Sequence, residues 1–313
     1  MHSYRLIAPA KINLLLEIIG DRPDGYHELV MVLQSIDLSD RIDLQPLGGD
    51  RIKLHCDHPQ VPLDESNLAY RAAQLMQDRF PGRGGVDITI HKQIPIGAGL
   101  AGGSANGAAV LVGLDLMWEL GLTQGELQAL GAKLGSDVPF CISGGTALAL
   151  GRGEELSPLR DLDQLYAVLA KYRSLSVSTP WAYQTYRQQF GHTYAQTPDA
   201  QDARRRSGPS VPLLAVIAHQ NAQAIGHTLH NELETVVLPA HPKVEQLRSA
   251  LSQQPVLGAM MSGSGPTVFA LTQRQDEAVQ IVANLKVEFT DPDLDFWVAK
   301  LIPHGIHLAP ATH

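Results

Sequence analysis

Alternating and apolar stretches predict strands in the first part of the chain. Residues 6–19 are rich in Leu and Ile and predict a strand that is interrupted at residues 9–11. The short runs 41–44 and 51–54 alternate polar and apolar positions on either side of two glycines, which is typical of a hairpin. Residues 86–91 alternate with a period of two and predict a half-buried strand that leads into a glycine-rich segment.

Apolar residues at helical spacing predict helices between and beyond these strands. Ser66 is a candidate N-terminal cap for the helical pattern that follows it, and residues 108–120 are apolar on most sides, which indicates a buried helix. Thr123 and Glu126 have the spacing of a capping box, and Gly135 is expected to end that helix. Strands and helices mix without the regular alternation of a doubly wound sheet, so the sequence favours an α+β fold.

Two breaks in the pattern indicate how the chain is divided. Between residues 150 and 165, glycines and a proline interrupt the regular patterns. We therefore expect one domain over residues 1–157 and a second over residues 158–313. Residues 191–212 are polar, contain proline and carry three consecutive arginines without an assigned role, so they are expected to form a mobile surface insertion.

Composition and charge narrow the class of protein. The chain has 313 residues, of which 44% are hydrophobic and 18% charged, as in soluble globular proteins. The 24 Lys and Arg against 32 Asp and Glu give a net charge of -8, which argues against a nucleic-acid partner because nucleic acids bind mainly to cationic surfaces. There is no apolar run of membrane-spanning length, no signal or transit composition at the start, and no metal-ligand spacing of the two cysteines. A cytoplasmic enzyme without a membrane partner is the expectation.

The segment after the strand at 86–91 is the strongest candidate for a ligand site. Glycine occupies four of the seven positions 97–103, directly before a helical pattern. Successive amides in such a loop can form a concave nest for an anion, to which a helix start adds its positive dipole end. A tight structural turn is the alternative, but the number of glycines and the closing serine favour a phosphate cradle, although the Gly-Lys ending of a Walker loop is missing. The candidate residues are Pro95, Ile96, Gly97, Ala98, Gly99, Leu100, Ala101, Gly102, Gly103, Ser104 and Ala105.

Lys11 and Asp137 are candidates for catalysis of phosphoryl transfer, which needs positioning, charge stabilisation and a proton acceptor. Lys11 stands among apolar neighbours, and on spacing alone a snorkelling side chain at a strand end is the favoured interpretation. Asp137 could simply cap a turn or a helix. A second small-residue loop at residues 261–266 is either a tight connection or backbone packed close to the phosphates.

Three of these motifs, taken in order, resemble the signature motifs of the GHMP kinase superfamily: residues 9–14, 95–105 and 261–265. Further segments resemble the members of that superfamily that phosphorylate the 2-hydroxyl of a cytidine diphosphate ester of methylerythritol, in the non-mevalonate route to isoprenoids. These segments are residues 24–29, 135–140, 177–183 and 231–234. The resemblance extends from about residue 4 to residue 305, and seven ordered motifs are hard to obtain by chance.

The resemblance implies a two-domain fold and two cofactors. The N-terminal domain is expected to be similar to the ribosomal protein S5 domain 2 fold, and the C-terminal domain to be an α/β sandwich of ferredoxin-like type. ATP is the implied phosphoryl donor and Mg²⁺ the accompanying metal, with no protein ligand of the metal assigned. The implied partner is a small-molecule acceptor, and the chain is expected to be a monomer or a weak homodimer.

Residue roles are also implied by the matching motifs. Asp137 is the implied base for the acceptor hydroxyl, and Lys11 beside it keeps the carboxylate ionised and steadies the attacking oxygen. The implied ATP site combines the loop at 95–105 with Asn67 and Lys92. The implied acceptor residues are Asn13 for the methylerythritol part, Tyr26 and His27 for cytosine, Tyr183 for stacking on the base, and Thr179 near the polyol.

Two alternatives stay open at the level of the sequence. The acceptor could be homoserine, mevalonate or a sugar, as in other GHMP kinases, but Tyr26, His27 and Tyr183 would then have no base to bind. A nucleotide-binding protein without catalysis would need neither Lys11 nor Asp137.

Two local features depart from the expected patterns. Ala101 stands where many relatives have glycine, and a negative φ there would tolerate its methyl group. The histidine pairs at 227/230 and 304/307 lack the third ligand of a zinc site, so solvated or helix-face histidines are favoured.

Overall fold

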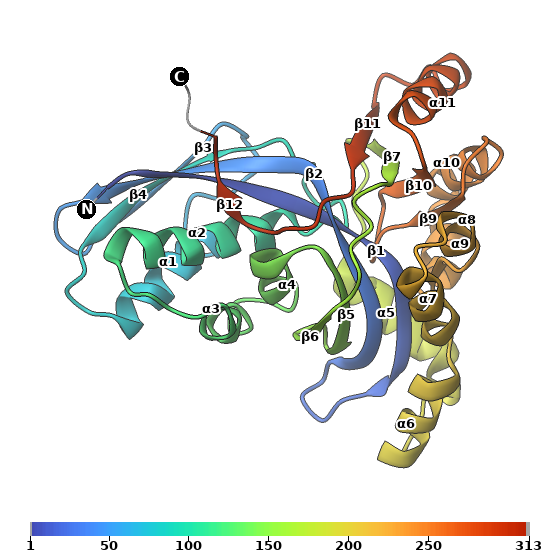
Figure 1. Cartoon of the computed structure of the whole chain (residues 1–313), viewed down its shortest axis with the longest axis horizontal. Coiled ribbons are helices and arrows are strands. Elements are labelled where there is room, and N and C mark those ends of the chain that lie inside the picture. Colours follow the sequence, from blue (N-terminus) through green and yellow to red (C-terminus); the bar gives the residue numbers. More distant parts are fainter. Residues whose placement is uncertain (1, 311–313) are drawn as a thin grey trace.

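The computed structural model describes residues 2–310, which form two lobes around two β-sheets (Figure 1). The strands of the first sheet are β1 (Tyr4–Asp21), β2 (His27–Leu47), β3 (Ile52–Cys56), β4 (Gly85–His91), β5 (Thr146–Gly151), β6 (Glu155–Pro158), β8 (His230–Asn231) and β12 (His307–Leu308). Their order is β12-β1-β2-β4-β3, with β5 paired to β2 and β6, and β8 paired to β1. The second sheet has the order β11-β7-β10-β9, formed by β7 (Tyr166–Tyr172), β9 (Gly258–Met261), β10 (Val268–Thr272) and β11 (Leu294–Lys300).

The helices divide between the two lobes. In the first lobe they are α1 (Leu68–Arg79), α2 (Gly102–Trp118), α3 (Gln124–Gly131) and α4 (Val138–Ser143), which lie together below the long strands in Figure 1. The second lobe contains α5 (Thr179–Phe190), the 3-10 turn η1 (Gly191–Thr193), α6 (Pro198–Ser207), α7 (Ser210–Ala218), α8 (Ala222–His227), α9 (Glu234–Ala240), α10 (Pro242–Ser252) and α11 (Gln275–Glu288). No helix in residues 2–310 combines the length and apolarity needed to cross a membrane.

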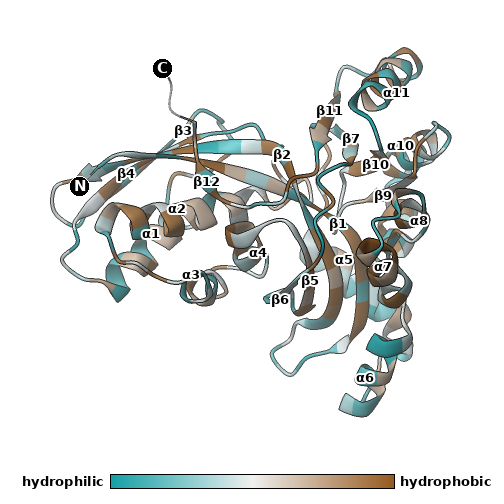
Figure 2. Cartoon of the chain, in the orientation of Figure 1, coloured by the Kyte–Doolittle hydropathy of each residue, from teal (hydrophilic) through white to brown (hydrophobic). Residues whose placement is uncertain are grey.

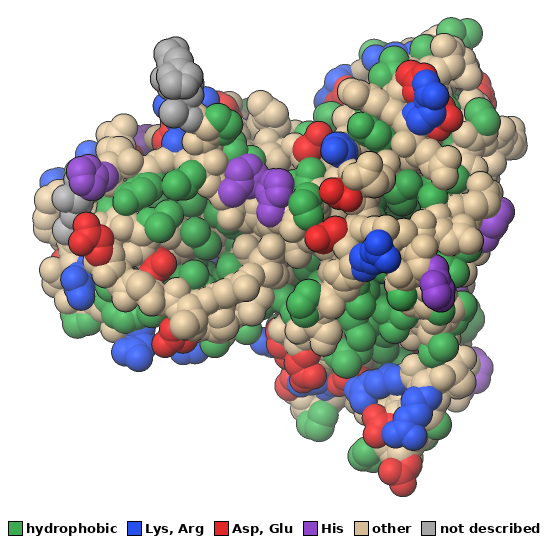
Figure 3. Space-filling model, in the orientation of Figure 1, with side chains coloured by type: hydrophobic (Ala, Val, Ile, Leu, Met, Phe, Trp, Pro, Cys, Tyr) green, Lys and Arg blue, Asp and Glu red, His purple; other side chains and the backbone are tan. Residues whose placement is uncertain are grey.

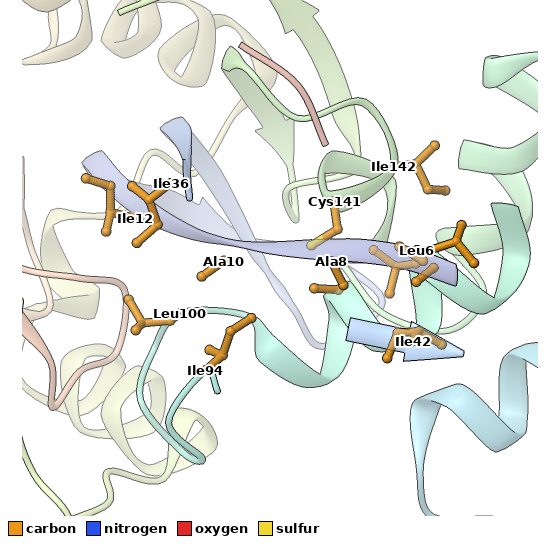
Figure 4. Packing of buried hydrophobic residues seen from close by; sticks show 14 of the residues in the cluster. Leu6, Ala8, Ala10, Ile12, Ile36, Ile42, Ile94, Leu100, Cys141 and Ile142 are labelled. Carbon is orange, nitrogen blue, oxygen red and sulfur yellow. The ribbon is translucent and has the colours of Figure 1, made fainter. Parts of the chain in front are cut away.

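Strand β1 is buried on both of its faces, which explains its nearly continuous run of apolar residues. One face belongs to the core of the first lobe, where Figure 4 shows Ala10 near Leu100 and Ile94. The other face joins the core of the second lobe. The buried apolar residues from Leu6 to Leu15 belong to the first core, whereas Leu16 and Ile18 near the end of the strand belong to the second. The strand therefore ties the two cores together.

Several expected elements are confirmed. The α+β class holds, the half-buried strand at 86–91 is β4, and the buried helical pattern at 108–120 belongs to α2. The capping box is present at the start of α3, where the Thr123 hydroxyl accepts from the Glu126 amide and the Glu126 carboxylate accepts from the Thr123 amide.

Other local expectations are wrong. β1 is not interrupted at residues 9–11, because the strand passes Pro9 with a shift in register after it, and such irregularities tolerate proline. β3 does not form a hairpin with β2 but pairs in parallel with β4, which itself pairs with β2. Asn67, not Ser66, caps α1, since its side chain accepts from the Ala69 amide. Gly135 lies beyond the end of α3 at Gly131.

The expectation of a mobile loop over residues 191–212 is also wrong. η1, α6 and the start of α7 fill this segment. Figure 2 shows α6 as mainly hydrophilic, and Figure 3 shows Lys and Arg side chains gathered over the same part of the molecule. No side chain of α6 is buried. The polar composition of this segment therefore reflects a helix, α6, that packs on the protein without burying an apolar face.

Candidate active site

A cavity of about 680 Å³ opens between the two lobes. It brings together residues from β1, the loop before α2, the start of α4 and the start of α5. Of the predicted site residues, those that line it are Lys11, Asn13, Tyr26, His27, Asn67, Lys92, residues 95–103, Asp137, Thr179 and Tyr183. Ser104 and Ala105 of the predicted loop do not line it.

Lys11 and Asp137 lie close together in the lining of this cavity. The Lys11 Nζ lies 3.8 Å from the Asp137 Oδ2 and donates a 2.7 Å hydrogen bond to the Asn13 Oδ1. Lys11 is only 5% exposed, so the snorkelling interpretation is wrong. Asp137 occupies the N-cap position of α4, yet its side chain makes no capping hydrogen bond. Its carboxylate is therefore free to face Lys11 and the cavity.

The three superfamily-like motifs touch one another beside this pair. The Lys11 amide donates to the Leu100 carbonyl at 3.1 Å, and the Asn13 amide donates to the Ser262 hydroxyl at 3.4 Å. That hydroxyl donates to the Gly99 carbonyl at 3.2 Å. Gly99 has a φ of +74°, and a Cβ on it would lie 2.4 Å from the Ser262 carbonyl oxygen, so glycine is required by both conformation and space.

The glycine loop ends at the start of α2, where Ala101 has a φ of 58°. The expectation that a negative φ accommodates its methyl group is therefore wrong. In the left-handed region the Cβ crowds the following carbonyl oxygen, which makes Ala101 a strained residue. The first amides of α2 begin directly after it, at Gly102.

A buried carboxylate that sequence reasoning missed anchors the approach to this loop. Asp40 is fully buried on β2 and pairs with Lys92. It also accepts hydrogen bonds from the Gln93 amide at 2.7 Å, the Ile94 amide at 2.8 Å and the Asn106 Nδ2 at 2.7 Å. The sequence around position 40 shows only a short run of acidic and polar residues, which does not mark Asp40 as buried. The hydrogen-bond donors of Asp40 lie more than fifty residues away in the chain.

His27 also lines the cavity and packs against two aromatic rings. The rings of His27 and Tyr183 are 5.0 Å apart and tilted by 30°, and the Tyr194 ring meets His27 edge-on at 5.9 Å. Burial, reinforced by the positive charge of Arg187 and opposed by Asp21, lowers the pKa of His27 below its ordinary 6.5. Within the described residues, the buried Nε2 of His27 has no hydrogen-bond partner.

The remaining acceptor-side residues differ in exposure. Tyr26 is 51% exposed at the rim, beneath the Arg152 guanidinium, which lies 5.0 Å from its ring centroid. The Thr179 hydroxyl forms a 2.8 Å hydrogen bond with the Ser264 hydroxyl of the second small-residue loop. Arg152 and Arg187 line the cavity but were missed from the sequence, where Arg152 stands between two glycines that only indicated a break.

Within residues 2–310, no cluster of three or more His, Cys, Asp or Glu residues has the arrangement of a metal site. The His304 and His307 rings pack edge-on at 4.5 Å, and neither His pair forms part of the cavity lining.

Comparison with known proteins identifies the family. The GHMP kinases N terminal domain pattern matches residues 67–145, and the GHMP kinases C terminal pattern matches residues 213–290. The chain is 66% identical over 308 residues to 4-diphosphocytidyl-2-C-methyl-D-erythritol kinase of Acaryochloris marina, covering 98% of this chain and 99% of that protein. It is 61% identical to the enzyme of the same name from Cyanothece sp., covering 99% and 100%. The chain belongs to the family of 4-diphosphocytidyl-2-C-methyl-D-erythritol kinases.

Solved structures agree with this family assignment. A crystal structure of 4-(cytidine 5'-diphospho)-2C-methyl-D-erythritol kinase superposes with a TM-score of 0.74 at 31% identity, covering 95% of this chain and 98% of that one. Homoserine kinase from Cytophaga hutchinsonii gives 0.76, but at 20% identity it indicates a shared fold alone. The expected two-domain GHMP kinase fold, with an S5-like N-terminal domain, is confirmed.

Membership in the 4-diphosphocytidyl-2-C-methyl-D-erythritol kinase family makes this chain an ATP-dependent small-molecule kinase. The alternative of a nucleotide-binding protein without catalysis has no support from the relatives, since the two full-length relatives described above are named as kinases. The roles of the individual side chains stay predictions, and so do the domain limits at 1–157 and 158–313.

Proposed function

We propose that the protein transfers the γ-phosphoryl group of ATP to the 2-hydroxyl of 4-diphosphocytidyl-2-C-methyl-D-erythritol, producing ADP and the 2-phosphate. The observation that carries this proposal is the Lys11–Asp137 pair at 3.8 Å, next to the glycine loop. The names of the full-length relatives supply the acceptor.

In this proposal Asp137 accepts the proton of the acceptor hydroxyl as its oxygen attacks the γ-phosphorus. Its carboxylate is not used for capping α4, so it can orient a hydroxyl before the reaction begins. The Lys11 ammonium stabilises negative charge on the attacking oxygen. Asn13, which accepts from Lys11, fixes the direction of that ammonium and can contact the methylerythritol hydroxyls.

The chain also has groups that fit ATP. The loop at 95–103 offers backbone amides where Gly97 and Gly99 adopt positive φ, and α2 contributes its N-terminus. Asn67 and Lys92 are proposed to lie near the adenine. Mg²⁺ is part of the proposal, and it would neutralise charge on the transferring phosphates.

The cytidine end of the acceptor is assigned to the aromatic side of the cavity. A lowered pKa keeps His27 neutral near pH 7, so its ring offers one donor and one acceptor to the polar edge of cytosine. Tyr183 and the exposed Tyr26 are proposed to contact the base faces, and Thr179 the polyol. A base stacked on an aromatic ring gains about 1–3 kcal/mol.

The wider setting belongs to the same proposal. The chain would act as a monomer or weak homodimer in the cytoplasm, without a nucleic-acid partner. The net charge of -8 supports the last point, because a polyanion would be repelled.

The test is ADP release by purified protein given ATP, Mg²⁺ and the cytidylyl acceptor. We expect turnover with this acceptor and none above background with homoserine, mevalonate or galactose. Asp137→Asn should lower kcat by about 10²–10⁴-fold, the usual contribution of general base catalysis, with the Kd of ATP unchanged. Wild-type protein that releases no more ADP than the Asp137→Asn variant would refute the proposal.

A further inference from the structure

Helix α6 is attached to the rest of the protein through charged side chains. No residue of this helix is buried, and an isolated helix of its ten residues would be marginal in water. Its position must therefore depend on specific contacts. Two of its arginines, Arg204 and Arg205, make those contacts with strands of the first sheet.

Arg205 reaches the strand that carries His27. Its Nη2 lies 2.6 Å from the Glu28 Oε1, while the Arg22 Nη1 lies 2.8 Å from the Glu28 Oε2. Glu28 is nearly buried and follows His27 directly in β2. The Arg205–Glu28 contact therefore links α6 to the side chain of the residue that follows His27.

Arg204 is linked to His27 indirectly, through the segment that carries Tyr194. Its Nη1 donates to the Thr193 carbonyl at 3.1 Å, and the next residue, Tyr194, packs edge-on against the His27 ring. The same guanidinium bridges Glu17 on β1, at 3.2 Å, and Glu232 after β8, at 2.9 Å. Glu28, which follows His27 in the chain, and Tyr194, one of the two rings that pack on His27, are thus linked to α6.

We propose that Arg204 and Arg205 are positioning residues that hold His27 in register with the cytosine of the acceptor. This inference rests on the proposed function. Hydrogen bonds weaken steeply with distance and angle, so a small shift of the buried His27 ring would reduce affinity for the cytidine part. The ATP side of the cavity is formed by other elements and would be unaffected.

Arg205→Ala is the primary variant, because Arg204→Ala would leave the 1% exposed Glu17 without its cation and endanger folding. The matched control is Arg206→Ala on the same helix, whose exposed side chain makes no ion pair with any residue in the described range 2–310. Titration calorimetry with CDP and with ADP as separate probes measures the two ends of the cavity independently.

We expect Arg205→Ala to weaken CDP binding five- to tenfold and to raise KM for the cytidylyl acceptor by a similar factor. ADP binding should stay within twofold, Arg205→Lys should recover part of the loss, and Arg206→Ala should match wild type. If Arg205→Ala does not fold, Glu28→Gln, which removes the same charge contact, is measured in its place with the same expectation.

The inference is overturned if CDP affinity stays within twofold of wild type, if CDP and ADP weaken equally, or if wild-type protein does not bind CDP. Wild-type protein that binds CDP and ADP but releases no ADP with the acceptor would instead refute the proposed function. In that case the ratio of CDP affinities between variant and wild type still decides the role of the arginines.

Discussion

Replacement of Asp40 by asparagine should destabilise the first lobe far more than a typical loss of an ion pair. The Asp40 carboxylate is fully buried and faces only donors: the Lys92 ammonium, two backbone amides and the Asn106 amide group. Asp40→Asn exchanges one acceptor oxygen for an NH2 group that points at these donors. It also leaves the Lys92 ammonium, 5% exposed at its side chain, without a counter-charge.

The expected loss follows from the burial of the pair. Removal of one partner from a buried ion pair lowers the free energy of unfolding by about 3–5 kcal/mol, because a desolvated charge is left behind. Total stability is about 5–15 kcal/mol, so this is a large fraction. For a domain of roughly 150 residues, each kcal/mol shifts Tm by about 2–4 °C, which gives a decrease of about 6–20 °C.

A matched control separates burial from the chemistry of the substitution. Asp291 pairs with Lys243 at 3.2 Å, with side chains 36% and 60% exposed. Asp291→Asn should therefore cost far less stability than Asp40→Asn, because solvent screens the charges of an exposed pair.

Differential scanning calorimetry of wild type, Asp40→Asn, Lys92→Met, the double variant Asp40→Asn/Lys92→Met and the control Asp291→Asn provides the assay. Removal of both charges should recover at least about 1 kcal/mol relative to the sum of the single effects, as expected for residues in contact. The reasoning is refuted if Asp40→Asn loses no more stability than Asp291→Asn, or if the double variant is additive.

Two further outcomes test the loop and the base site. Ala101→Gly should raise the free energy of unfolding by about 0.5–1 kcal/mol, because relief of left-handed strain exceeds the added chain entropy. The control Ala283→Gly, at an exposed position inside α11, should lower the free energy of unfolding by about 1 kcal/mol. Changes of the same sign for the two variants in urea titrations would contradict this reasoning. Since the pKa of His27 is lowered below its ordinary 6.5, the neutral form predominates at pH 7 and above, and its contribution to CDP binding and stability should be lost as the pH falls below 6.5. A KM for the cytidylyl acceptor that already rises between pH 8 and 7 would speak against that assignment.

Features that depend on near neighbours in the chain were predictable from the sequence. The period-two strand β4 and the Thr123–Glu126 capping box follow from residues at most a few positions apart. The glycine loop was also predictable from its local sequence, because Gly97 and Gly99 adopt the positive φ that glycine alone reaches without strain. These local preferences agree with the final fold, so the local pattern was sufficient.

Features decided by distant contacts were not predictable. The strand β3 alternates as a hairpin partner of β2 would, but β4 arrives later in the chain and inserts between them. Residues 191–212 have the composition of a solvated loop, yet Arg204 and Glu17 form an ion pair across 187 positions of sequence. The sequence shows that these arginines are charged but not which carboxylates they will pair with. The polar composition therefore suggested a disordered loop, whereas ion pairs hold the segment in place as helix α6.

The geometry around Lys11 explains why this lysine looks out of place in its strand. A buried ammonium is costly unless it is paired, and charge-assisted hydrogen bonds usually span about 2.7–2.9 Å. Within residues 2–310, Lys11 makes such a contact only with the neutral Asn13, whereas Asp137 stays at 3.8 Å and uses none of its oxygens for capping. Folding alone would favour a closer pair. The separation leaves both charges able to contact one additional oxygen, and under the proposed mechanism that oxygen is the hydroxyl to be phosphorylated.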